Sequence, residues 1–251
     1  GTASITATAD DSDITLTDPA NALTGPITVV SDDSDADDAE DIALTNSIAT
    51  VLGGTTDSGS LAVTAVTGGI TQTGPLDVDG VSSFTTQADD ADITLSNAGN
   101  ALGGAVTFTS TDTNANDAED IVLLNTGTTT LGGTTGSGTL DVTAATGNIT
   151  QNGPLEVGDA SSFTTQADDA TITLTDAGNT LDGPVAFAST DTNANDAEAV
   201  ALTNAAATVL AGTTETGDFA LVSSGGVTQT GALEVGGTTS ITENADDADI
   251  T

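Results

Sequence analysis

The ten residues Ser82-Ser-Phe-Thr-Thr-Gln-Ala-Asp-Asp-Ala91 decide the fold, because they recur letter for letter as Ser161-Ser-Phe-Thr-Thr-Gln-Ala-Asp-Asp-Ala170. Relaxed copies lie upstream and downstream. The alanine that opens each Ala-Asp-Asp stands at positions 9, 88, 167 and 245, so the position rises by 79, 79 and 78 from copy to copy. A fixed long period is the signature of a repeat array. We therefore treat 1–251 as one continuous array, with repeats at approximately 9–87, 88–166 and 167–244 and a partial repeat at 245–251.

The composition excludes several classes of protein. The 251 residues include no Lys, Arg, His, Cys, Met, Trp or Tyr, and the 38 Asp and Glu give a formal net charge of −38. High charge with few aromatic residues is typical of disorder, but here apolar residues alternate with Thr and Ser, as they do in half-buried strands. Disulfides and thiolate metal ligands are impossible. Every charged side chain is acidic, which opposes nucleic-acid binding.

Each repeat reads as a series of short strands separated by turns. Between Ala88 and Thr165 the apolar pairs are bounded by turn-forming stretches such as Asn97–Asn100 and Gly153-Pro154. Strands of this kind can form a sandwich, a propeller or a solenoid, and three blades would be few for a propeller. We favour an all-β parallel solenoid with about four coils of about 20 residues in each repeat.

The alternation also predicts which side chains form the core. A coil spacing of about 4.8 Å would make 12 to 13 coils a rod roughly 60 Å long, with Thr, Ser, Asn and Asp facing water. The side chains that we expect to point inward are Ile93, Leu95, Phe108, Ile121, Leu123, Leu140, Val142, Leu155, Val157 and Phe163.

Each repeat carries one acidic loop whose oxygen-bearing side chains suit a hard cation such as Ca²⁺. The spacing is not that of an EF-hand, because Asp117 stands where that loop needs glycine. No organic cofactor is indicated. The candidate metal ligands are Asp33, Asp35, Asp37, Asp38, Glu40 and Asp41 in the first copy, Asp112, Asn114, Asn116, Asp117, Glu119 and Asp120 in the second, and Asp191, Asn193, Asn195, Asp196 and Glu198 in the third.

Two interpretations of these loops stay open. Asp89 and Asp90 precede Asp112 by about one coil, so the two acidic stretches can stack on neighbouring turns about 5 Å apart. Carboxylates at that distance repel by roughly 1 kcal/mol in water and about 3 kcal/mol at an effective dielectric of 20. Either divalent cations bridge the charges, or the loops are a solvated acidic face that keeps the rod soluble.

Three similar stretches carry a resemblance to a known family. Gly69-Ile-Thr-Gln-Thr-Gly-Pro-Leu-Asp-Val78, Asn148-Ile-Thr-Gln-Asn-Gly-Pro-Leu-Glu-Val157 and Gly226-Val-Thr-Gln-Thr-Gly-Ala-Leu-Glu-Val235 resemble repeats of giant bacterial adhesins of the filamentous-haemagglutinin type, which are associated with two-partner secretion. The resemblance implies a right-handed parallel β-helix that serves as the shaft of a secreted, cell-surface or matrix protein.

The sequence therefore favours a structural function over catalysis. No His, Cys, Lys or Tyr is available as a base or nucleophile, so we expect no enzyme. We expect the shaft of an extracellular or cell-surface bacterial filament, adhesin or biofilm-matrix fibre, stabilised or bundled by divalent cations and associating with copies of itself. The alternative is an adhesive module that binds a glycan or host surface through its acidic or Thr-rich face. No apolar run is long enough to span a bilayer, and the ends fall within repeats, so we expect a longer array.

Overall fold

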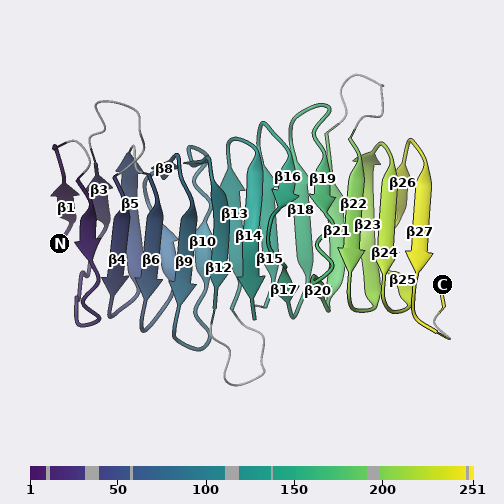
Figure 1. Ribbon diagram of the computed structural model, residues 1–251, viewed down its shortest axis with the longest axis horizontal. Helices are drawn as coiled ribbons and strands as arrows, with labels where there is room; N and C mark the ends of the chain where they lie inside the picture. Colours follow the sequence, from purple (N-terminus) through teal and green to yellow (C-terminus); the bar gives the residue numbers. More distant parts are fainter. Residues whose placement is uncertain are drawn as a thin grey trace.

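The computed structural model describes residues 1–9, 12–31, 40–56, 59–110, 119–136, 138–190, 198–246 and 249–251. Every regular element in these ranges is a β-strand, and every pairing between strands is parallel. Figure 1 shows the chain winding into a flattened solenoid, with strands alternating between two long sheets. The chain descends through the nearer sheet and ascends through the farther one as it advances, so the coil is right-handed. The predicted right-handed parallel β-helix is confirmed.

The two long sheets contain nearly all of the strands. The first long sheet stacks β1 (Ala3–Thr6), β3 (Ile27–Val30), β5 (Thr50–Thr56), β7 (Ile70–Gln72), β10 (Ile93–Leu95), β13 (Ile121–Asn125), β15 (Leu140–Ala144), β18 (Ser161–Thr165), β21 (Pro184–Ala188), β23 (Thr208–Thr216) and β25 (Val227–Gln229), with β26 (Leu233–Val235) also paired to β23. The second long sheet stacks β2 (Ile14–Leu16), β4 (Ile42–Asn46), β6 (Leu61–Ala65), β9 (Ser82–Thr86), β12 (Ala105–Thr109), β14 (Thr129–Thr135), β16 (Ile149–Gln151), β19 (Ile172–Leu174), β22 (Val200–Asn204), β24 (Phe219–Ser223) and β27 (Thr239–Glu243). Two short pairs complete the coil, β8 (Asp77–Val78) with β11 (Ala101–Leu102) and β17 (Glu156–Val157) with β20 (Thr180–Leu181).

One sequence repeat makes three and a half coils. Ile14, Ile93 and Ile172 are equivalent positions in successive repeats, yet Ile14 and Ile172 lie in the second long sheet and Ile93 lies in the first. Seven steps of strand pairing lead from Ile14 to Ile172, so these two repeats fill seven coils. A coil therefore averages roughly 23 residues, which is within the usual range for the units of a solenoid. The structure thus makes the expected figure of about four coils of about 20 residues more exact.

Coil length varies because the turns differ in length. Ile93 pairs with Ile121, so one coil runs from position 93 to position 120. Ile121 pairs with Leu140, so the next coil is shorter and runs only from 121 to 139. The longer coil contains the acidic loop, whose length the alternating pattern cannot reveal. Each long sheet has a path of eleven strands in the described part of the chain, so the rod is roughly 50 Å long rather than roughly 60 Å.

Successive repeats are related by half a turn about the rod axis. Where the first repeat meets the second, Phe84 stacks on Phe108 in the second long sheet, with ring centroids 5.9 Å apart. Where the second repeat meets the third, Phe163 stacks on Phe187 in the first long sheet, with ring centroids 5.8 Å apart. Equivalent phenylalanines thus pack in the same way in the two opposite sheets that enclose one core.

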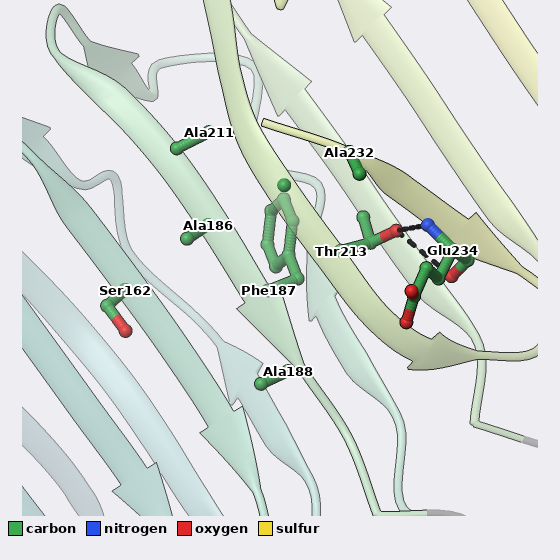
Figure 2. A pocket seen from close by; sticks show the side chains of 9 residues that line it. Ser162, Ala186, Phe187, Ala188, Ala211, Thr213, Ala232 and Glu234 are labelled. Atoms are coloured by element: carbon green, nitrogen blue, oxygen red, sulfur yellow. Dashed lines mark hydrogen bonds between the residues drawn. The ribbon is translucent and has the colours of Figure 1, made fainter. Parts of the chain in front are cut away.

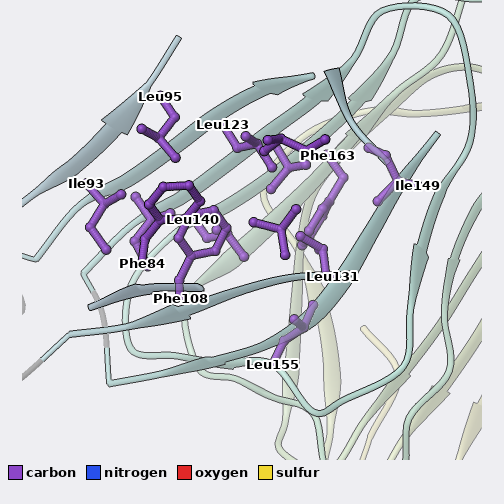
Figure 3. Close-up of a cluster of buried hydrophobic side chains, with 14 of the residues drawn as sticks. Phe84, Ile93, Leu95, Phe108, Leu123, Leu131, Leu140, Ile149, Leu155 and Phe163 are labelled. Atoms are coloured by element: carbon purple, nitrogen blue, oxygen red, sulfur yellow. The ribbon is translucent and has the colours of Figure 1, made fainter. Parts of the chain in front are cut away.

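The core runs between the two long sheets, and Figure 3 shows part of it. The side chains alternate buried and less buried along the strands, as in β13 and β15. All ten side chains predicted to point inward are at most 2% exposed, which confirms that expectation. Burying this apolar surface supplies the main favourable free energy of folding.

Buried asparagines hold the turns of neighbouring coils together. Asn100 is 0% exposed. Its Nδ2 donates to the carbonyl oxygens of Leu95 and Leu124 at 3.2 and 3.0 Å, and its Oδ1 accepts the N–H of Leu76 at 3.0 Å. Asn179 makes the equivalent bonds one repeat later. One side chain therefore satisfies backbone groups in three consecutive coils, where strand pairing is interrupted.

A β-bulge recurs once per repeat, in β5, β14 and β23, and shifts the strand register there. The bulge glycines Gly54, Gly133 and Gly212 have φ of 131°, 137° and 142°. The next residue braces the bulge: Thr213 Oγ1 accepts the N–H of Glu234 at 2.8 Å and donates to its carbonyl oxygen at 3.0 Å (Figure 2). The bulge thus joins two neighbouring coils through a side chain as well as through the backbone.

We expect Asn100→Asp to lower the free energy of unfolding by at least about 2 kcal/mol, because two buried carbonyl groups lose their donor and a charge enters the core. Urea unfolding measures the loss, and hydrogen exchange should quicken at Leu76. Asn97→Asp is the matched control, since Asn97 Oδ1 accepts the Gly99 N–H at 2.9 Å on the exposed side of the turn, and aspartate can accept it too. Equal effects of the two changes would contradict the bracing role.

We expect Gly133→Ala to lower the free energy of unfolding by about 1–3 kcal/mol, because an L side chain strains a backbone with positive φ. A Cβ atom there would also lie 3.0 Å from the carbonyl oxygen of Pro154. Gly127→Ala is the control: nothing lies within 4 Å of a Cβ atom at Gly127, so its effect should stay within about 0.5 kcal/mol. Thermal unfolding of both variants decides the matter.

Candidate functional site

The strands on either side of each acidic loop lie in different long sheets. The β3–β4 and β21–β22 turns lead from the first long sheet to the second, whereas the β12–β13 turn leads from the second to the first. Most of the predicted ligands, namely Asp33, Asp35, Asp37, Asp38, Asp112, Asn114, Asn116, Asp117, Asp191, Asn193, Asn195 and Asp196, lie outside the described residues. The metal assignment for those side chains stays a prediction.

The glutamate that ends each acidic loop is buried. Glu40, Glu119 and Glu198 are 1%, 0% and 0% exposed, although each is two residues from a strand and close to the edge of the rod. The sequence grouped these glutamates with the other loop residues. In the structure they differ from an ordinary loop carboxylate, because they point into the coil rather than into solvent.

Glu119 and Glu198 each accept a hydrogen bond from the Ala-Asp-Asp turn of the preceding coil. The N–H of Asp90 donates to Glu119 Oε1 at 2.9 Å, and the N–H of Asp169 donates to Glu198 Oε1 at 2.8 Å. Asp90 and Asp169 have φ of 58° and 61°, in the left-handed region that aspartate tolerates better than most residues. That conformation helps to place the N–H where the buried glutamate can accept it.

Three carboxylates gather at each of these turns. One carboxylate oxygen from each of Asp89, Asp90 and Glu119 lies within 4.8 Å of the others, and Asp168, Asp169 and Glu198 repeat the arrangement. We call these the two carboxylate clusters. The predicted stacking of the acidic stretches on neighbouring coils is therefore present between Asp89, Asp90 and Glu119; Asp112 lies outside the described residues. The aspartates of both clusters were not among the predicted ligands, although the exact recurrence of the Ala-Asp-Asp motif pointed to them.

The electrostatics of a cluster are unfavourable without a counter-charge. The carboxylate oxygens lie at most 4.8 Å apart, where two unit charges repel by at least about 1 kcal/mol in water and at least about 3 kcal/mol at an effective dielectric of 20. No Lys, Arg or His exists in the sequence to offset the charge. Moreover, Glu119 Oε2 and Glu198 Oε2 are buried and accept no hydrogen bond from the described residues. Each cluster thus contains a buried acceptor that has no hydrogen-bond partner among the described residues.

The other two predicted ligands that the structure describes brace turns instead. Asp120 Oδ1 accepts the N–H and the hydroxyl of Thr139 at 2.9 and 2.7 Å, and Asp41 Oδ1 bonds Ser60 in the same way. Asp218 and Thr238 form a third such pair. The Thr238 N–H, and then its hydroxyl, lower the pKa of the Asp218 carboxyl. These carboxylates link neighbouring coils, and they are not members of either carboxylate cluster.

A hollow of about 340 Å³ on the first long sheet offers little chemistry (Figure 2). Four of its nine lining residues are alanines, and Glu234 is the one titratable side chain among the nine. Two of the alanines, Ala186 and Ala188, stand where the preceding repeat has Thr107 and Thr109. The hollow therefore reflects shorter side chains on the sheet surface rather than a convergent set of polar groups.

Comparison with known proteins places the chain in a family. The family described as repeats of unknown function (DUF5649) matches residues 1–30, 39–109, 118–188 and 197–251. The stretches between these matches cover most of the length of each of the three acidic loops. No curated protein and no solved structure matches the chain. Within the described residues, no helix is long and apolar enough to cross a membrane. Because the matches cover most of its length, this repeat protein with a β-solenoid fold belongs to the DUF5649 repeat family.

Proposed function

We propose that the chain is a segment of a structural shaft, in an extracellular filament, an adhesin of the filamentous-haemagglutinin type or a biofilm-matrix fibre. The observation that carries this proposal is the continuity of the core: both long sheets run through every repeat, from β1 and β2 to β25 and β27. A chain of independent domains would instead show boundaries crossed by few contacts. An uninterrupted solenoid resists bending because each coil is hydrogen-bonded to the next.

The arrangement of polar side chains supports the same function. Asn100, Thr134 and Asp120 each connect neighbouring coils. Such bonds add side-chain contacts to the backbone pairing between coils. Asn179 and Thr213 repeat two of these connections in the next repeat. Polar groups that in an enzyme would converge on a substrate are distributed here along the rod, one set to each repeat.

The chemistry available to the chain favours a shaft over an enzyme. A general base or covalent nucleophile of the His, Cys, Lys or Tyr type is absent from the sequence. The hollow on the first long sheet has one titratable group, Glu234. Localisation outside the cell is part of the proposal and rests on the resemblance of stretches such as Gly69–Val78 to secreted adhesins.

Lengthening the array tests the shaft directly. Four additional copies of residues 88–166, inserted after Gln166, should add fourteen coils and lengthen the rod by roughly 67 Å. Small-angle scattering should give the same cross-sectional radius of gyration before and after the insertion, because a shaft grows only along its axis. Growth of the cross-section, or a maximum dimension that does not rise, would contradict the shaft.

A glycan and cell-surface binding screen on the same lengthened protein separates the shaft from the adhesive module. A shaft should show no saturable binding, since its repeated surface is built to extend the rod. Saturable binding to a defined glycan, lost when exposed threonines such as Thr71 and Thr228 are replaced by alanine, would favour the adhesive alternative. The two measurements are independent, because a protein can be rod-shaped and still bind a ligand.

A further inference from the structure

We propose that each carboxylate cluster binds one Ca²⁺ ion between neighbouring coils. The first site is formed by Asp89, Asp90 and Glu119, and the second by Asp168, Asp169 and Glu198. The inference goes beyond the structural role, because it assigns a metal site with named ligands. It does not depend on where the rod is used or on what it is attached to.

The buried glutamate oxygen is the strongest argument for an ion. Glu119 is 0% exposed, and its Oε1 accepts the Asp90 N–H while its Oε2 has no partner among the described residues. A buried acceptor left without a partner is destabilising. A cation held between the Glu119 carboxylate and the two aspartates would supply that partner. Glu198 shows the same combination on the opposite edge of the rod, so the arrangement is a repeated feature of the fold.

The distances fit a single ion. Calcium binds oxygen at about 2.3–2.6 Å, so two ligands on opposite sides of the ion are about 4.6–5.2 Å apart. The three carboxylate oxygens of each cluster lie within 4.8 Å of one another. One ion can therefore contact all three carboxylates with little movement of the backbone.

The ligand types select a hard cation. All three ligands are carboxylates, and the sequence has no His or Cys that would favour zinc or copper. Calcium accepts six to eight oxygens in irregular geometry, whereas magnesium demands a near-ideal octahedron and retains its waters. Glu119 and Glu198 are buried, whereas Asp90, Asp168 and Asp169 are exposed and Asp89 is intermediate. A site with one fixed carboxylate and two more exposed ones suits the irregular geometry of calcium better than the strict octahedron of magnesium.

The ion would connect coils that the backbone already pairs. Asp89 and Asp90 lie in the turn between β9 and β10, and Glu119 lies just before β13, which pairs with β10. An ion held by both turns closes the edge of the rod between these coils. Because it binds the folded arrangement and not the unfolded chain, it raises thermal stability by mass action.

Calorimetry on the 251-residue protein in 150 mM NaCl tests the proposal with CaCl₂ as the probe. We expect saturable binding whose stoichiometry falls by two ions in the variant Glu119→Gln/Glu198→Gln. Glu119→Asp/Glu198→Asp keeps the charge but withdraws each carboxylate by one methylene, and should bind at least tenfold more weakly. The rise in Tm between EDTA and saturating Ca²⁺, roughly 5 °C or more in the wild type, should largely disappear in both variants.

The control is Asp141→Asn/Glu156→Gln, which changes two exposed acidic side chains outside the clusters. It makes the same change in net charge, from −38 to −36, and should keep the full stoichiometry and Tm response. Because each Tm difference is taken within one variant, a change in basal stability does not obscure the result. Equal losses in the control and cluster variants, or a response that NaCl reproduces at equal ionic strength, would overturn the proposal. Either result leaves the scattering test of the shaft unaffected.

Discussion

Parallel hydrogen bonding between successive coils is the interaction on which the rest of the structure depends. A strand in the middle of either long sheet pairs with the coil before it and the coil after it, so strand positions must match from coil to coil. Residues that have no pairing partner at the matching position of the neighbouring coil form turns or bulges. The result is a long coil that begins at Ile93, followed by a much shorter one that begins at Ile121 and ends before Leu140. Constant strand register and variable turn length are two aspects of the same constraint.

The strands and the core could be predicted because they depend on local pattern. Alternation of apolar and polar residues identified strands such as Ile121–Asn125, and the burial of Ile121 and Leu123 follows from a period of two. The exact number of coils in a repeat could not be predicted, because it depends on how many residues lie in each turn rather than in a paired strand. Asn100 illustrates the same limit: asparagine is common in turns, and only the neighbouring coils, which contribute Leu76 and Leu124, explain its burial.

The carboxylate clusters were harder to find from the sequence than the fold. The acidic loops attract attention because their residues are close together in the chain, and their composition suits a cation. Asp90 and Glu119 are separated by a whole coil, and what joins them is the left-handed conformation of Asp90 together with the inward turn of Glu119. Neither property can be seen in composition. The recurrence of Ala-Asp-Asp and its distance of about one coil from the acidic loop placed the two stretches on neighbouring coils, but neither signal indicated that Glu119 is the residue that Asp89 and Asp90 meet.

The half-turn between repeats gives copy number a meaning beyond length. Within the described residues, each of the first two repeats contributes seven strands to the two long sheets, so equivalent turns alternate between the two edges of the rod. A recombination event that inserts or deletes one repeat would rotate everything beyond the junction by half a turn, whereas an event involving two repeats would restore the original facing. Whether the number of inserted or deleted repeats is odd or even therefore decides which side of the rod faces a given direction beyond the junction. Two alleles that differ by a single repeat would differ in this facing as well as in the length of the rod.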